Sequence, residues 1–157
     1  MPPKTILLMR HAEEPEGAKD PDLSPAGRIR AGKLAPFVVA TFGKPDYVFA
    51  AAVNRHSSRA CLTMRPLCNA NDVPLDASLP AKEAVALATK LLSEVAYADK
   101  LVVVCWTHTE LPGLAGALGA RRGEFPNPWD AAVFNLILQL DYRGSDVPSV
   151  TRVVQPF

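Results

Sequence analysis

The stretch Lys100-Leu-Val-Val-Val-Cys105 is the clearest buried strand in the sequence, because five apolar residues follow Lys100 without interruption. A short apolar run without polar alternation is typical of a strand that is covered on both faces. Two further short runs, Thr5 to Met9 and Asp46 to Ala50, also indicate strands. The sequence therefore predicts a sheet whose central strands are buried.

Helical patterns separate these strands. Ser24 followed by Pro25 is typical of a helix start, and Gly43-Lys-Pro45 is typical of a helix end. The predicted helix between them carries Pro36, which can kink it, and turns a set of apolar side chains inward: Ile29, Leu34, Phe37 and Val38. Three more helices are expected: from Ser57 or Ser58 to Leu67, from Ala81 to Ala96, and from Glu110 to Leu118.

Strands that alternate with helices indicate a mostly parallel sheet with helices on both faces. The last two predicted strands, Val133 to Leu140 and Val150 to Val154, form a hairpin that adds an antiparallel edge. We therefore expect a single α/β domain over residues 1–157, built as a three-layer α/β/α sandwich. In such sheets a ligand binds beyond the carboxyl ends of the strands.

The overall composition excludes several classes of protein. A net charge of +1 argues against nucleic acid or an anionic membrane as the main partner. No run approaches the length of a membrane-spanning helix, and no signal peptide is recognisable. The three cysteines, Cys61, Cys68 and Cys105, fit no zinc pattern, so we expect reduced thiols, a cytoplasmic protein, and no metal or cofactor.

Basic side chains gather directly after the predicted strands. All three histidines of the sequence and three of its arginines lie there: Arg10, His11, Arg55, His56, Arg59 and His108. The carboxyl ends of parallel strands meet at one edge of the sheet. We therefore expect these side chains to form a positively charged site on a protein that is otherwise nearly neutral. An anion is the expected ligand of this site, because arginine guanidinium groups bind phosphate oxygens bidentately.

A histidine beside an arginine can also perform covalent chemistry. Neutral imidazole can take a phosphoryl group, and positioned cations stabilise the charge that spreads over the transferring group. A proton donor must then serve the leaving oxygen. Two acids are candidates: Glu110, which follows His108 closely, and secondly Glu13, which is close to His11 in the sequence.

Four segments resemble, in order, the motifs of the histidine phosphatase superfamily, the phosphoglycerate mutase-like proteins. Leu7-Leu-Met-Arg-His-Ala-Glu13 resembles the Arg-His-Gly signature, and Leu23-Ser-Pro-Ala-Gly27 resembles the Leu-Thr-x-x-Gly that follows it. Ser58-Arg-Ala-x-x-Thr63 resembles the motif of the second arginine, and Val102-Val-Val-x-x-x-His108 resembles the strand of the second histidine. The resemblance implies a three-layer α/β fold and spans most of the chain.

The resemblance also implies roles for individual residues. His11 would be the nucleophile that forms a phosphohistidine intermediate, while Arg10, Arg59 and His108 would bind the phosphoryl group. Arg55 is a possible helper in substrate binding, and Glu13 a further contact. Our reading from the residues alone places His56 on the rim.

The sequence departs from the family pattern in ways that matter for function. Ala12 replaces the usual glycine, as in the branch that resembles short bacterial phosphohistidine phosphatases, and His108 is not followed by a glycine pair. The segment between Thr63 and the last parallel strand is short, so the capping elements of mutases and larger phosphatases are missing and the site should be open.

We therefore expect a metal-independent phosphatase acting on a phosphomonoester or on phosphohistidine. A phosphorylated small molecule and a phosphoprotein both fit an open site. A catalytically silent phosphate-binding regulatory module is the alternative, and a phosphomutase is disfavoured by the missing cap. The sequence indicates neither the physiological substrate nor the oligomeric state.

Overall fold

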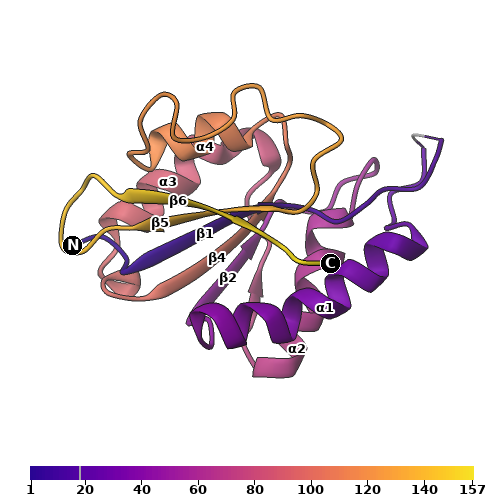
Figure 1. Ribbon diagram of the computed structural model, residues 1–157, viewed down its shortest axis with the longest axis horizontal. Coiled ribbons are helices and arrows are strands. Elements are labelled where there is room, and N and C mark those ends of the chain that lie inside the picture. The colour runs from indigo at the N-terminus through magenta and orange to yellow at the C-terminus, as the bar shows by residue number, and fades with distance from the viewer. Residues whose placement is uncertain (18) are drawn as a thin grey trace.

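A computed structural model describes residues 1–17 and 19–157 of the protein. The chain runs through ten main elements, shown in Figure 1: β1 (Thr5–Arg10), α1 (Pro25–Phe42), β2 (Tyr47–Ala50), α2 (Arg59–Asn71), β3 (Leu75–Asp76), α3 (Ala84–Ser93), β4 (Leu101–Trp106), α4 (Leu111–Ala117), β5 (Leu136–Asp141) and β6 (Ser149–Val154). Single turns of 3₁₀ helix flank α3, at Ala81–Glu83 and Val95–Tyr97.

The strands form one six-stranded sheet in the order β3-β2-β4-β1-β5-β6. The first four of these strands are parallel, whereas β5 is antiparallel to β1 and β6 is antiparallel to β5. The predicted parallel sheet with an antiparallel carboxyl-terminal edge is therefore confirmed. The register places Arg10 opposite Trp106 and Ala50 opposite Cys105, so β1, β4 and β2 end at the same level.

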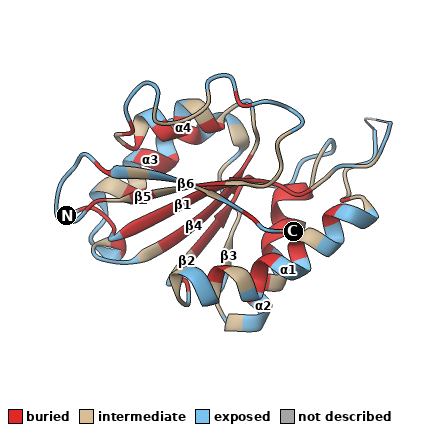
Figure 2. Cartoon of the chain, in the orientation of Figure 1, coloured by how far each residue is buried: buried red, intermediate tan, exposed pale blue. Residues whose placement is uncertain are grey.

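Helices α1 and α2 cover one face of the sheet, and α3 and α4 cover the other (Figure 1). All six residues of β1 are buried, and β1, β4 and β2 form a buried band between helices that are exposed on their outer sides, whereas the edge strand β6 is largely exposed (Figure 2). Leu7 and Val103, paired across β1 and β4, have no exposed surface. Each such fully buried side chain stabilises the fold by ~1.5–3 kcal/mol.

Helix α1 begins where the sequence predicted, because the Ser24 hydroxyl accepts a hydrogen bond of 3.0 Å from the backbone N–H of Gly27. The helix continues through Pro36, which lies with Gly32 on the exposed side. Water can therefore reach the Gly32 carbonyl that proline leaves without an amide partner. The prediction that Ile29 points inward is wrong, since small residues, among them Gly27, define the buried side, and Ile29 is 60% exposed.

Two other predicted elements have different bounds in the structure. The helix expected over Ala81 to Ala96 is helical in three pieces, and its Val95 is 88% exposed. The strand expected from Val133 begins only at Leu136. The preceding residues form a turn, in which the Val133 N–H donates to Asp130 and the Trp129 indole donates to the Val133 carbonyl.

The three cysteines are free and buried, and burial raises the pKa of the Cys68 thiol to about 11. Within the part of the chain that the structure describes, no helix has the length and apolar character needed to cross a membrane.

Candidate active site

His11 lies directly beyond the buried end of β1. Its backbone N–H donates to the Trp106 carbonyl at 3.3 Å, so the last contact between β1 and β4 holds His11 at the sheet edge. The side chain is 5% exposed. A backbone anchored on a central strand gives the imidazole a defined position.

The hydrogen bonding of His11 determines which ring nitrogen is free. Nδ1 lies 2.7 Å from the Ala12 carbonyl oxygen, and since a carbonyl can only accept, Nδ1 carries the hydrogen. Nε2 is therefore the nitrogen with the lone pair. Burial, together with the nearby Arg10 and Arg59 guanidinium groups, lowers the pKa of His11 to about 4 although the Ala12 carbonyl opposes the shift. The imidazole is thus neutral at pH 7, the state that a nucleophile requires.

Arg10 is 1% exposed, but only some of its hydrogen-bond donors have an acceptor among the described residues. Its Nη1 donates to the Ala131 carbonyl, and its guanidinium carbon lies 3.9 Å from the centre of the Phe134 ring. Nε and Nη2 are buried without a hydrogen-bond partner. Unpaired buried donors are costly in a folded protein, and such a group signals an unfilled position for an acceptor.

Arg59 reaches the same place from the first turn of α2. Its Nη1 donates to the carbonyls of Asp20, at 2.9 Å, and His56, at 3.4 Å, whereas Nε is buried without a partner. Burial lowers the pKa of Arg10, and Arg59 contributes in the same direction, which indicates that the two guanidinium groups are close.

Thr63 connects α2 to the loop after β1. Its hydroxyl donates to the Arg59 carbonyl at 2.7 Å and accepts from the backbone N–H of Ala12 at 2.9 Å. Thr63 has no exposed surface. One hydroxyl therefore holds the residue after His11 against the helix that carries Arg59.

His108 follows β4 and is half-buried. Burial and the Arg10 charge lower the pKa of His108, so His108 lies within the field of the Arg10 guanidinium group. A cavity of about 280 Å³ begins beside it; its lining includes Pro112, Trp129 and Ala131, the residue whose carbonyl binds Arg10. The buried Thr107 hydroxyl next to His108 has no hydrogen-bond partner either.

Glu14 is the acid that faces this cluster. Its Oε1 lies 3.6 Å from Arg10 Nη2, and its Oε2 lies 3.3 Å from Arg59 Nη2. The side chain is 42% exposed, and its charge also acts on both His11 and His108. No local pattern identifies Glu14, because the i, i+4 spacing brings side chains together in a helix and residues 11–15 are not helical.

Glu13, expected as a proton donor or substrate contact, pairs with a residue of helix α1. Its carboxylate accepts two hydrogen bonds from Arg30 of α1, at 2.8 and 3.1 Å. Burial is the largest single effect and raises the pKa of Glu13, but the hydrogen bonds to its carboxylate and the charges of Arg30 and Arg10 together outweigh burial, and the net shift is downward. A carboxylate that accepts two hydrogen bonds from an arginine is held in its ionised form and is a poor proton donor.

The remaining candidates are on the periphery. Arg55 and His56 are exposed and contact each other, with Arg55 Nε 3.2 Å from His56 Nε2. Glu110 caps α4 through its backbone, and its side chain has no hydrogen bond or ion pair to any described residue. Trp106 is buried and donates to the Ala81 carbonyl, so it packs in the core.

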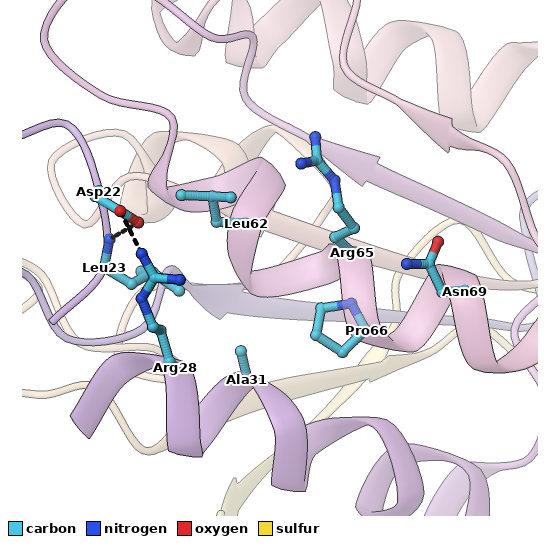
Figure 3. A pocket seen from close by; sticks show the side chains of 8 residues that line it. All are labelled: Asp22, Leu23, Arg28, Ala31, Leu62, Arg65, Pro66 and Asn69. Atoms are coloured by element: carbon cyan, nitrogen blue, oxygen red, sulfur yellow. Dashed lines mark hydrogen bonds and ion pairs between the residues drawn. The ribbon is translucent and has the colours of Figure 1, made fainter. Parts of the chain in front are cut away.

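A separate groove of about 430 Å³ lies between α1 and α2 (Figure 3). Leu62 and Pro66 of α2 face Ala31 of α1 across it, and Arg28 pairs with Asp22 at one end. None of the side chains around His11 lines this groove. Over residues 1–17 and 19–157, no three side chains of the metal-ligating types lie together.

Several solved structures have the same fold. One is a protein assigned as the phosphohistidine phosphatase SixA of Agrobacterium tumefaciens, which is 16% identical, with a TM-score of 0.62 and 97% of this chain and 98% of that chain covered. A protein histidine phosphatase SixA in complex with tungstate is 15% identical, with a TM-score of 0.65 and 96% of each chain covered.

A third is the mycobacterial glucosyl-3-phosphoglycerate phosphatase in complex with inorganic phosphate. It is 16% identical, with a TM-score of 0.61, and 98% of this chain and 97% of that chain are covered. Comparison with protein-family models and with curated protein sequences finds no match. At the level of the fold, the resemblance to the histidine phosphatase superfamily is confirmed.

Proposed function

We propose that this protein is a metal-independent histidine phosphatase with His11 as nucleophile. The observation that carries the proposal is the set of unpartnered donors beside a neutral imidazole. Arg10 Nε and Nη2 and Arg59 Nε are buried without a hydrogen-bond partner among the described residues, and His11 has its lone pair on Nε2. A phosphoryl group supplies the acceptors that these donors lack.

In the first step Nε2 of His11 forms a bond to phosphorus while the bond from phosphorus to the leaving oxygen or nitrogen breaks. Arg10 and Arg59 bind the phosphoryl oxygens, and His108 adds a further donor from the end of β4. Because these groups are held by buried backbone, they stabilise the developing charge without rearranging. Water then attacks the phosphohistidine and releases inorganic phosphate.

The substrate is a phosphorylated small molecule or a phosphoprotein. The cavity beside His108 is lined by Trp129 and two prolines and by Ala131, whose carbonyl accepts a hydrogen bond from Arg10. It offers room for the part of the substrate beyond the phosphoryl group. The SixA and mycobacterial phosphatase structures contain tungstate and phosphate, respectively. They support a tetrahedral oxyanion as the ligand of this site.

The covalent intermediate can be trapped directly. Rapid mixing with a labelled aryl phosphate, followed by denaturation in base, should give a protein-bound phosphate that is stable in base and lost in acid. His11→Ala should abolish both the label and turnover. A matched control is His56→Ala, which removes an exposed histidine and should leave the label in place.

Two results would contradict the proposal. Labelling that persists in His11→Ala would exclude His11 as the nucleophile. Tight binding of phosphate by the wild-type protein without label or turnover would instead support a silent phosphate-binding module.

A further inference from the structure

A phosphatase that acts on alkyl phosphates must protonate the leaving oxygen, and neither acid expected from the sequence is placed to do so. Glu13 is held by Arg30, and Glu110 has no side-chain contact with the cluster. Asp130, whose charge acts on Arg10, uses its carboxylate to accept from the backbone N–H of Ala132 at 2.8 Å. Glu14 alone among these acids contacts both guanidinium groups.

The contacts of Glu14 are loose. Its oxygens lie 3.3 and 3.6 Å from the two arginine Nη2 atoms, and Arg10 Nη2 still has no hydrogen-bond partner. The Glu14 carboxylate therefore lies beside the two guanidinium groups but does not accept a hydrogen bond from Arg10 Nη2. A bound phosphoryl group can take that position and leave Glu14 next to it.

The direction of attack determines which side of the phosphoryl group needs the acid. His11 is 5% exposed and attacks from the protein side, whereas the Glu14 side chain is 42% exposed. In-line displacement places the leaving oxygen opposite the nucleophile, hence towards the solvent side where Glu14 lies.

We propose that Glu14 is the proton donor of the reaction, an assignment that rests on the proposed function. As His11 Nε2 bonds to phosphorus, the bond to the leaving oxygen breaks and its electron pair takes the proton of the Glu14 carboxyl group. The resulting carboxylate then accepts a proton from the water that attacks the phosphohistidine. The carboxyl group is thereby restored, and inorganic phosphate leaves.

The test compares leaving groups of different acidity. A dinitrophenolate departs without a proton, whereas an alkoxide does not. In Glu14→Gln the ratio of kcat/KM for dinitrophenyl phosphate to kcat/KM for an alkyl phosphate should rise at least ~100-fold, the usual contribution of a general acid. Glu16→Gln is the matched control, because it removes the same charge from an exposed position in the same loop and should leave the ratio unchanged.

Each alternative has its own result. A role for Glu14 in holding the arginines would lower kcat/KM for both substrates equally, and this result would overturn the proposal. A rise of the ratio in Glu110→Gln in place of Glu14→Gln would overturn it as well. Trapping of the His11 phosphate is measured in parallel. If wild-type protein gives no label, the proposed function fails, whereas a label with an unchanged ratio in Glu14→Gln removes only Glu14.

Discussion

A buried neutral histidine makes the stability of this protein depend on pH. Burial and two arginines lower the pKa of His11 to about 4 in the folded protein, against 6.5 for an exposed histidine. Well above pH 6.5, His11 is neutral in both the folded and the unfolded protein, so its titration does not affect the free energy of unfolding. As the pH falls from 6.5 towards 4, the unfolded chain binds a proton that the folded protein does not, so the free energy of unfolding decreases.

We therefore expect wild-type protein to lose more stability than His11→Gln between pH 7.5 and pH 4. The decrease in the free energy of unfolding should be larger for wild type than for His11→Gln by up to about 3 kcal/mol, as measured by urea unfolding. His56→Gln, at a surface position, should retain the wild-type dependence. Equal losses in wild type and His11→Gln would mean that His11 is not held neutral by its surroundings.

At the scale of elements, the docking of α1 against the loop after β1 depends on one glycine. A Cβ atom on Gly27 would lie 2.3 Å from the backbone oxygen of Glu13, a contact that no backbone tolerates without shifting. The same oxygen accepts from the Ser24 N–H at 2.9 Å. The start of α1 and the loop that carries Glu14 are thus packed backbone to backbone, which explains the glycine of the Leu23 to Gly27 motif.

Gly27→Ala should destabilise the protein by ~1–3 kcal/mol, as overpacking does, and should also reduce phosphatase activity per folded molecule because the loop must move. Gly32→Ala is the control in the same helix. Gly32 is exposed with nothing within 4 Å of an added Cβ, so this change should stabilise the protein by ~0.5–1 kcal/mol. Thermal melts of both variants test the pair, and a neutral Gly27→Ala would show that the contact can relax.

The whole molecule gathers scattered charges into one site. A chain of net charge +1 places Arg10, Arg59 and His108, from three segments far apart in sequence, around His11 because three parallel strands end at one level. In the proposed mechanism, these side chains supply the electrostatic stabilisation of the phosphoryl group.

Activity should therefore be unaffected by metal removal. The described residues hold no cluster of three or more metal-ligating side chains, so dialysis against EDTA should leave kcat/KM unchanged. Loss of activity that returns on adding a divalent cation would contradict the proposed chemistry. A tetrahedral oxyanion such as vanadate serves as the positive control for inhibition.

Local sequence determined most of the fold and the chemical types at the site. Buried strands are apparent from apolar runs such as Leu101 to Cys105, and the start of α1 from Ser24 and Pro25, because strand burial and helix capping depend on neighbouring residues. The position of His11 beyond β1 and His108 beyond β4 follows from the same runs.

Tertiary structure alone decided which acid faces the phosphoryl position. Glu13 and Glu14 are adjacent and chemically identical in the sequence, yet Glu13 pairs with Arg30 of α1 while Glu14 contacts Arg10 and Arg59. Phe134 and the Ala131 carbonyl likewise join the site only through the turn before β5. These roles depend on distances between segments up to 121 residues apart, and no local pattern encodes such distances.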